Sequence, residues 1–267
     1  MAWKLCSVTQ VEEVKCLVRM VPIWLTAIPF AIVFSQVNTL FIEQAAVMDT
    51  ELWRGFTMPP ASISLVNVLS IFACTVLYPW TVVPMARLVT GRQEGLTHLQ
   101  RLGLGIAATA MAVAVAALVE TRRLSEAAAG RQMGVTWLVP QELVLGASQV
   151  LTIVGAMDFF YREAPHSMRG LVSALSLANL ALGSFGSTLL VSVTMKFSAR
   201  NGRAPGWIPP NLDDGHLDYF YWLLFCITVA NATFFYLAAM WYTRFSAPPS
   251  VVSGHTTGPT TGPKSNR

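Results

Sequence analysis

The chain has 267 residues, of which 54% are hydrophobic and only 12% are charged, and its formal net charge is +4. A soluble domain normally carries about 25% charged residues, so this composition excludes an ordinary soluble domain and indicates a protein embedded in lipid. The basic residues stand at the ends of apolar segments and form no patch, so the positive charge does not predict a nucleic-acid partner.

Six segments are apolar over the roughly 20 residues that a helix needs to cross a bilayer. We therefore predict an all-α membrane protein with a transmembrane domain at residues 14–245. Its six helices are expected at 16–43, 60–86, 100–119, 135–158, 169–196 and 217–243. Residues 1–13 lack the pattern of a signal peptide and are expected to form a cytoplasmic segment. Residues 246–267 contain a repeated TTGP and are expected to be a disordered tail.

The 18 Lys and Arg residues predict how the helices are oriented. With the N-terminus in the cytoplasm, 11 of them lie on the cytoplasmic side and the other 7 on the outer side. Basic residues favour the cytoplasmic side of a membrane. Both termini are therefore expected in the cytoplasm, with the loops at 44–58 and 197–216 outside.

Small residues and prolines inside the predicted helices bear on how they pack. Pro22 and Pro29 lie two turns apart in the first helix and are expected to kink it. In the fifth helix, Gly183 and Ser187 lie four residues apart, a spacing that lets two helix backbones approach closely. We expect tight packing there rather than a moving hinge. The four cysteines share no metal-ligand or redox spacing and are interpreted as packing residues.

Three blocks of sequence stand out along the chain. They read VEEVKCLVRMVPIWLTAIPFAIVFSQVNTLFIEQAAVMDT at 11–50, FFYREAPHSMRGLVSALSLANLALG at 159–183 and GWIPPNLDDGHLDYFYWLL at 206–224. In this order they resemble the plant nitrate transporter 1/peptide transporter family, a branch of the proton-dependent oligopeptide transporters within the major facilitator superfamily. The likeness runs from about Val11 to Arg244. Such carriers usually have twelve spans in two halves, and the resemblance is to the C-terminal six-helix half.

The resemblance implies a transmembrane transporter, namely the C-terminal half of a proton-coupled nitrate- or peptide-type secondary carrier that works by alternating access. The family's first-half motif E-x-x-E-R, which couples transport to protons, has no match here. No cofactor is implied, because the full-length family uses the proton gradient as its energy source. The implied partners are the lipid bilayer, a small-molecule solute (nitrate, a peptide or a specialised metabolite) and the missing N-terminal half, in the plasma membrane or the vacuolar membrane.

An alternative interpretation is a transport-inactive truncated half that binds a full-length relative. The start at Met1 leaves a truncated gene, a partial gene model and an unusual isoform open. An enzyme is not expected, because the sequence contains neither H-E-x-x-H nor G-x-S-x-G, and its four histidines fall in predicted loops or in the tail.

Gln149 lies in the apolar stretch GASQVLTIVG, where the resembled family often has a glutamate that faces the substrate amine in peptide carriers. An amide donates and accepts hydrogen bonds but cannot neutralise an ammonium group. Gln149 is interpreted either as a cavity-lining residue with an altered substrate preference or as a hydrogen-bond partner of another helix. Glu142 lies two turns earlier on roughly the same face, where the family usually has Tyr. It is expected either to replace the lost charge or to reach toward the headgroups.

Other candidates also depend on the resemblance. Some nitrate carriers of the family use a His as an anion ligand at the position of Phe34, so Phe34 weakens the expectation of nitrate as substrate. Pro79 and Trp80 replace an acidic–basic pair near the cytoplasmic mouth and are candidate gating residues. Gln36 and Asn67 lie near mid-span and complete the substrate-cavity candidates. For both of them, as for Asn38, Asn179 and Asn231, a hydrogen bond between helices is favoured over contact with the solute.

Overall fold

The computed structural model describes most of the chain, in seven segments. These are residues 8–36, 39–53, 55–91, 95–164, 169–198, 206–209 and 211–246. Residues 1–7 of the expected N-terminal segment lie outside the described residues, as do Asn38 and all but the first residue of the expected tail at 246–267.

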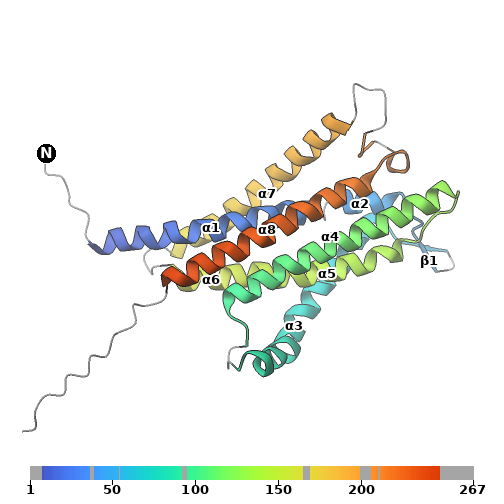
Figure 1. Ribbon diagram of the computed structural model, residues 1–267. Coiled ribbons are helices and arrows are strands. Elements are labelled where there is room, and N and C mark those ends of the chain that lie inside the picture. Colours follow the sequence, from blue (N-terminus) through green and yellow to red (C-terminus); the bar gives the residue numbers. More distant parts are fainter. Residues whose placement is uncertain are drawn as a thin grey trace, which may run out of the picture.

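Helices make up most of the structure, and Figure 1 shows them coloured in chain order. They are α1 (Val8–Gln36), α2 (Leu40–Ala46), α3 (Ile63–Thr90), α4 (His98–Ala128), α5 (Val139–Gln149), η3 (Val150–Val154), α6 (Gly155–Glu163), α7 (Arg169–Ser198) and α8 (Leu217–Ser246). Among the described residues, six helical stretches are long and apolar enough to cross a membrane. One of them joins α1 to α2, and another joins α5, η3 and α6. The prediction of an all-α protein with six spans is confirmed.

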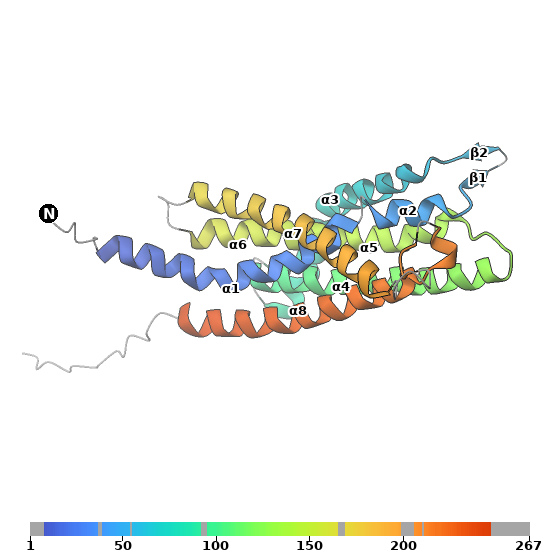
Figure 2. The ribbon, with the colours of Figure 1, turned by 90° about the horizontal axis from the view of Figure 1, so that it is seen from above.

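The loops gather at two opposite ends of the bundle (Figures 1 and 2). One end holds the start of α1 and the end of α8, and we call it the terminal end. The other holds the antiparallel hairpin of β1 (Glu51–Trp53) and β2 (Phe56–Thr57), and we call it the hairpin end. Three short helices also lie at the hairpin end: η1 (Pro60–Ser62), η2 (Val135–Leu138) and η6 (Leu212–Asp214).

Apolar side chains fill the space between the helices in three clusters, of which two are the larger. At the hairpin end, the cluster includes Leu145 of α5 and Phe220 and Tyr221 of α8, all completely buried. At the terminal end, it includes Ile23 of α1 and Leu102 of α4. Because lipid is as apolar as these side chains, the helices are held together by close packing and by hydrogen bonds between them.

By contrast, α3 and α7 expose large apolar side chains along much of their length. The exposed fraction is 79% for Trp80 and 88% for Leu88 on α3. On α7 it is 76% for Phe185 and 84% for Phe197. Apolar surface of this extent is expected where lipid or another protein covers it. We call these parts of α3 and α7 the uncovered surfaces.

The closest approach of α1 to α7 occurs at a glycine. A Cβ atom at Gly183 would lie 2.7 Å from the carbonyl carbon of Ala31, so no larger residue fits there without movement. One turn further along α7, the Ser187 hydroxyl accepts a hydrogen bond from Gln36 Nε2 at 2.5 Å. The prediction that Gly183 and Ser187 allow tight packing against another helix is confirmed.

Gly183→Ala is expected to push α1 and α7 apart, because the new Cβ atom would overlap the main chain of Ala31. Overpacking of this kind costs about 1–3 kcal/mol, so the thermal unfolding midpoint of the purified protein should fall. Gly170→Ala is the matched control on the same helix, since nothing lies within 4 Å of its Cβ position. Equal unfolding midpoints for the two variants would contradict the contact.

Candidate functional site

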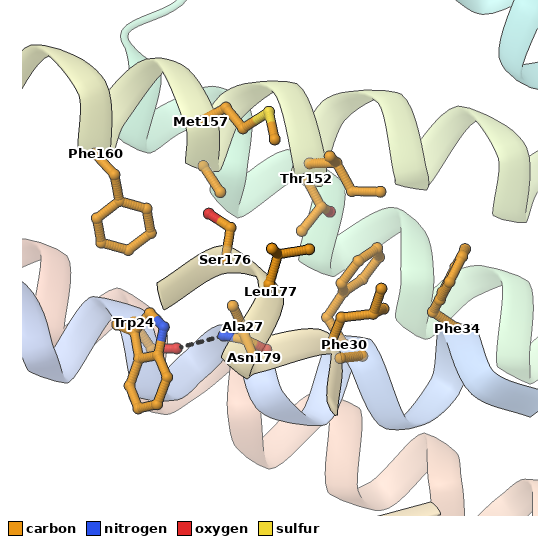
Figure 3. A pocket seen from close by; sticks show the side chains of 14 residues that line it. Trp24, Ala27, Phe30, Phe34, Thr152, Met157, Phe160, Ser176, Leu177 and Asn179 are labelled. Carbon is orange, nitrogen blue, oxygen red and sulfur yellow. Dashed lines mark hydrogen bonds between the residues drawn. The ribbon is translucent and has the colours of Figure 1, made fainter. Parts of the chain in front are cut away.

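A crevice with a volume of about 200 Å³ lies between α1, η3 with α6, and α7 (Figure 3). Its aromatic lining residues are Trp24, Phe30 and Phe34 from α1 and Phe160 from α6. Its polar lining residues are Thr152 from η3 and Ser176 and Asn179 from α7. None of the 14 lining residues carries a charge. An apolar wall with a few polar groups is the usual composition of a small-molecule site.

Hydrogen bonds between α1 and its neighbours hold the wall of this crevice. The indole Nε1 of Trp24 donates to Leu175 O at 3.0 Å. Asn179 Nδ2 donates to Trp24 O at 3.1 Å, the dashed line in Figure 3. From α8, Asn231 Nδ2 donates to Thr26 O at 2.9 Å. Asn179 and Asn231 therefore link helices, as their sequence positions suggested, and Asn179 also lines the crevice.

The span that supplies the opposite wall is interrupted by one wide π-helical turn, η3. Gly105 of α4 faces this turn, and a Cβ atom there would lie 2.7 Å from Thr152 N and 3.0 Å from the carbonyl carbon of Leu151. The Thr152 hydroxyl is buried and has no hydrogen-bond partner among the described residues. Such π-helical turns occur frequently at functional sites. Here the turn brings a polar residue without a partner to the wall of the crevice.

The five substrate-cavity candidates from the sequence do not meet in one place. Phe34 lines the crevice, whereas Gln149, Gln36, Asn67 and Glu142 do not. Gln36 is fully buried and bonds to α7. Asn67 Nδ2 donates to the main-chain oxygen of Glu142 at 3.4 Å, which links α3 to α5. Gln36 and Asn67 therefore act as contacts between helices in this arrangement.

Gln149 and Glu142 lie within the packed interior of the bundle. Gln149 is 2% exposed, and its Nε2 has no partner among the described residues. Glu142 is 0% exposed, and both of its carboxyl oxygens lack a partner there as well. The interpretation in which Glu142 reaches toward the headgroups is wrong, because no part of the residue is at the surface. Nor does the amide nitrogen of Gln149 donate to a neighbouring helix.

The candidate gating residues Pro79 and Trp80 are exposed on α3. The preceding residue, Tyr78 of α3, contacts α4, since the Arg101 guanidinium lies 4.3 Å from the centre of its ring. Arg101 Nη1 also lies 3.3 Å from an Asp158 carboxylate oxygen on α6. Gating by Pro79 and Trp80 therefore requires a partner that covers this surface of α3.

A buried polar network at the hairpin end joins α2, α4, α5 and α8. Arg123 Nε and Nη2 donate to the Glu120 carboxylate at 2.9 and 2.8 Å. Gln44 Nε2 donates to the same carboxylate at 2.7 Å. The Gln44 side-chain oxygen in turn accepts hydrogen bonds from Gln141 Nε2 at 3.4 Å and from the Tyr221 hydroxyl at 3.2 Å.

Arg123 extends this network to the segment before α8. It forms an ion pair with Asp213 of η6 and donates to Leu212 O at 3.3 Å. The network was not expected from the sequence, because hydropathy falls at Glu120 and the third helix was therefore expected to end at residue 119. The spacing of three residues between Glu120 and Arg123, which allows a pair on one helix face, was the available signal. No group of three or more His, Cys, Asp or Glu side chains among the described residues is placed to hold a metal ion.

Comparison with known proteins assigns this six-helix bundle to a protein family. The family model described as PTR2, POT family, matches residues 1–208. Two Arabidopsis thaliana proteins, NRT1/PTR FAMILY 8.1 and 8.2, are 41% and 42% identical to the chain over 249 residues, which is 91% of its length. The matched regions are 43% and 44% of these relatives, so the chain spans less than half the length of the curated relatives it matches.

Solved structures share this fold, and the chain again covers less than half of each of them. The in meso crystal structure of the POT family transporter PepTSo gives a TM-score of 0.70 at 20% identity and covers 88% of this chain but 43% of the transporter. The crystal structure of an auto-inhibited POT family peptide transporter gives 0.69 at 20% identity, covering 86% and 42%. At this identity the likeness concerns the fold, and the six helices correspond to less than half of each transporter.

Arg123→Met is expected to destabilise the protein by about 3–5 kcal/mol, because it leaves the Glu120 carboxylate buried without a cation. Arg131→Met is the matched control, since Arg131 pairs with Glu126 but is 71% exposed, and exposed pairs contribute about 0–1 kcal/mol. Thermal unfolding of both purified variants measures the difference. Adding Glu120→Gln to Arg123→Met should recover part of the loss. A similar unfolding midpoint for the two single variants would contradict the importance of the buried pair.

Proposed function

This chain belongs to the POT family, and from that premise we propose that it is the C-terminal half of a proton-coupled secondary carrier for nitrate- or peptide-type solutes. The relatives are membrane transporters and not enzymes, and the chain is a multi-pass membrane protein. The observation that carries the proposal is that about nine tenths of the chain aligns with less than half of each relative. In carriers built from two repeats, the solute site lies near the bilayer midplane between them.

The crevice between α1, α6 and α7 is the part of the solute site that this half contributes. Its aromatic rings suit an apolar or aromatic portion of a solute. The Thr152 hydroxyl is buried against Gly105 of α4, so the crevice offers the solute mainly an apolar wall. Because no lining residue is charged, nitrate or the charged ends of a peptide would require cations or anions from the other half. A peptide side chain or an apolar specialised metabolite is the solute portion that this wall fits best.

We also propose an energy source, a membrane and an orientation for the complete carrier. The proton gradient drives the complete carrier, and the coupling motif that this chain lacks belongs to the other half. The carrier resides in the plasma membrane or the vacuolar membrane with both termini cytoplasmic. The hairpin end then faces away from the cytoplasm. The excess of Lys and Arg at the terminal end supports this orientation.

A second candidate function is that of a transport-inactive half that binds a full-length relative. The uncovered surfaces of α3 and α7 favour it, because they offer large exposed side chains such as Trp80 and Phe185 to another helical protein. Measurements of uptake separate the two functions, since only the first predicts that this chain completes a working carrier.

In proteoliposomes, the chain alone is expected to show no proton-driven uptake, because its site lacks half of its walls. Together with the N-terminal six helices of an Arabidopsis relative, it should take up a dipeptide with an aromatic side chain. Phe34→Ala should then weaken the apparent affinity for that dipeptide up to about tenfold, given about 0.5–1.5 kcal/mol per aromatic contact.

Nitrate uptake should change little in Phe34→Ala, and Phe56→Ala, on the exposed hairpin, is the matched control. Saturable uptake that depends on the pH gradient, obtained with the chain alone, would overturn the proposal of a half carrier. Loss of nitrate and dipeptide uptake to the same extent in Phe34→Ala would overturn the assignment of the crevice.

The orientation can be tested with single cysteines in a background without the four native ones. Gln132→Cys lies at the hairpin end and Arg162→Cys at the terminal end, and both positions are exposed. A membrane-impermeant maleimide added to intact cells that carry the chain at the surface should label only the first. Labelling of Arg162→Cys before permeabilisation would reverse the proposed orientation.

A further inference from the structure

Two carboxyl groups are fully buried within the bundle, and they differ in their partners. Glu120 and Glu142 are both 0% exposed. Glu120 accepts hydrogen bonds from Arg123 and Gln44 at 2.7 to 2.9 Å. Neither carboxyl oxygen of Glu142 has a hydrogen-bond partner among the described residues. One buried carboxylate is therefore matched by a cation, and the other is not.

The helices packed around Glu142 present polar groups that are neutral or already bonded. From α3, the neutral amide of Asn67 donates to the main-chain oxygen of Glu142. From α8, the Tyr221 hydroxyl donates to the side-chain oxygen of Gln44. The amide nitrogen of the adjacent Gln141 likewise donates a hydrogen bond to Gln44. None of these groups carries a positive charge that could balance an ionised carboxylate at Glu142.

The charged groups of this region, from α4, α2 and η6, do not balance Glu142 either. Two arginines of α4 lie in this region: Arg123 is engaged by Glu120 and Asp213, and Arg122 is exposed and lies over the ring of Trp137. Glu43 of α2 is negative and exposed, so it cannot balance the charge either. An ionised Glu142 would thus be a buried negative charge without a partner. Such a charge costs many kcal/mol in a low-dielectric interior, and the group becomes neutral instead.

We infer that Glu142 is a proton-binding site of this chain. A proton from water binds one carboxylate oxygen, and the resulting neutral acid stays protonated while α5 is packed against α3, α4 and α8 as it is here. The proton returns to water only when this packing opens and the carboxylate can be hydrated. Protonation also removes the charge from a group whose two buried carboxyl oxygens have no partner among the described residues.

In the proposed carrier, this site gives the C-terminal half a proton-binding group of its own, on the same span as the π-helical turn that lines the crevice. That coupling role rests on the proposed function. Protonation of Glu142 does not, because it depends only on burial within these six helices. The two are therefore tested separately, and the failure of uptake by any combination of halves leaves the proton site unaffected.

Infrared spectroscopy of the purified chain at neutral pH tests the inference directly, through the carbonyl stretch of a protonated carboxylic acid. The wild type should show this band, and it should shift on transfer to D₂O. Glu142→Gln keeps the size and hydrogen-bonding capacity of the side chain but cannot be protonated as an acid, so the band should disappear. Glu120→Gln removes the equally buried but paired carboxylate, and the band should remain.

Each outcome decides the inference. Absence of the band from the folded wild type, or its persistence in Glu142→Gln, would overturn it, and so would its loss in Glu120→Gln alone. Because Glu120→Gln disturbs the pair with Arg123, Glu126→Gln, in an exposed pair with Arg131, serves as a control that is expected to fold normally and to keep the band. Circular dichroism of every variant confirms that the helices compared are intact.

Discussion

Lipid offers no hydrogen bonds, so each polar group in a membrane span must find its partner inside the protein. This constraint accounts for much of the arrangement of the six spans. Gln36 of α1 donates a hydrogen bond to Ser187 of α7, and Asn179 of α7 donates one to the main-chain oxygen of Trp24 on α1. Asn231 joins α8 to α1, and at the hairpin end Gln44 of α2 donates to Glu120 of α4. Apolar packing then fills the space between helices whose relative positions these bonds define.

Most departures from this constraint among the described residues lie on one span, the one formed by α5, η3 and α6, and the others are Arg101 on α4 and Asp218 on α8. Glu142, Gln149 and Thr152 each carry a buried polar atom without a partner among the described residues. A polar group left unsatisfied in a native structure is costly, and sites of this kind are retained where they have a function. This span also contains the π-helical turn and one wall of the crevice. The proposed solute site and the inferred proton site therefore share one helical element, through which they can influence each other.

Hydropathy and helical spacing predicted the parts of the fold that depend on composition. The six spans and the close approach at Gly183 follow from the length of the apolar runs and from the small side chains. The burial of Glu120 was not predictable from hydropathy, because it depends on pairing with Arg123 inside the helix and on Gln44 from a distant segment. Periodicity placed Glu142 and Gln149 on one face of a helix, but it could not tell which neighbouring helices cover that face. The π-helical turn likewise lies against Gly105 of a distant helix, a contact that no local pattern indicates.

In the proposed two-half carrier, the uncovered surface of α3 meets the second six-helix half. The most direct measurement is cross-linking in membranes that contain this chain together with the N-terminal six helices of an Arabidopsis relative carrying single cysteines. Trp80→Cys on α3 should cross-link to that half through a short bismaleimide, whereas Phe234→Cys, at an exposed position on α8, should not. Equal cross-linking from the two positions, or none from Trp80→Cys when both proteins are present in the membrane, would contradict the claim.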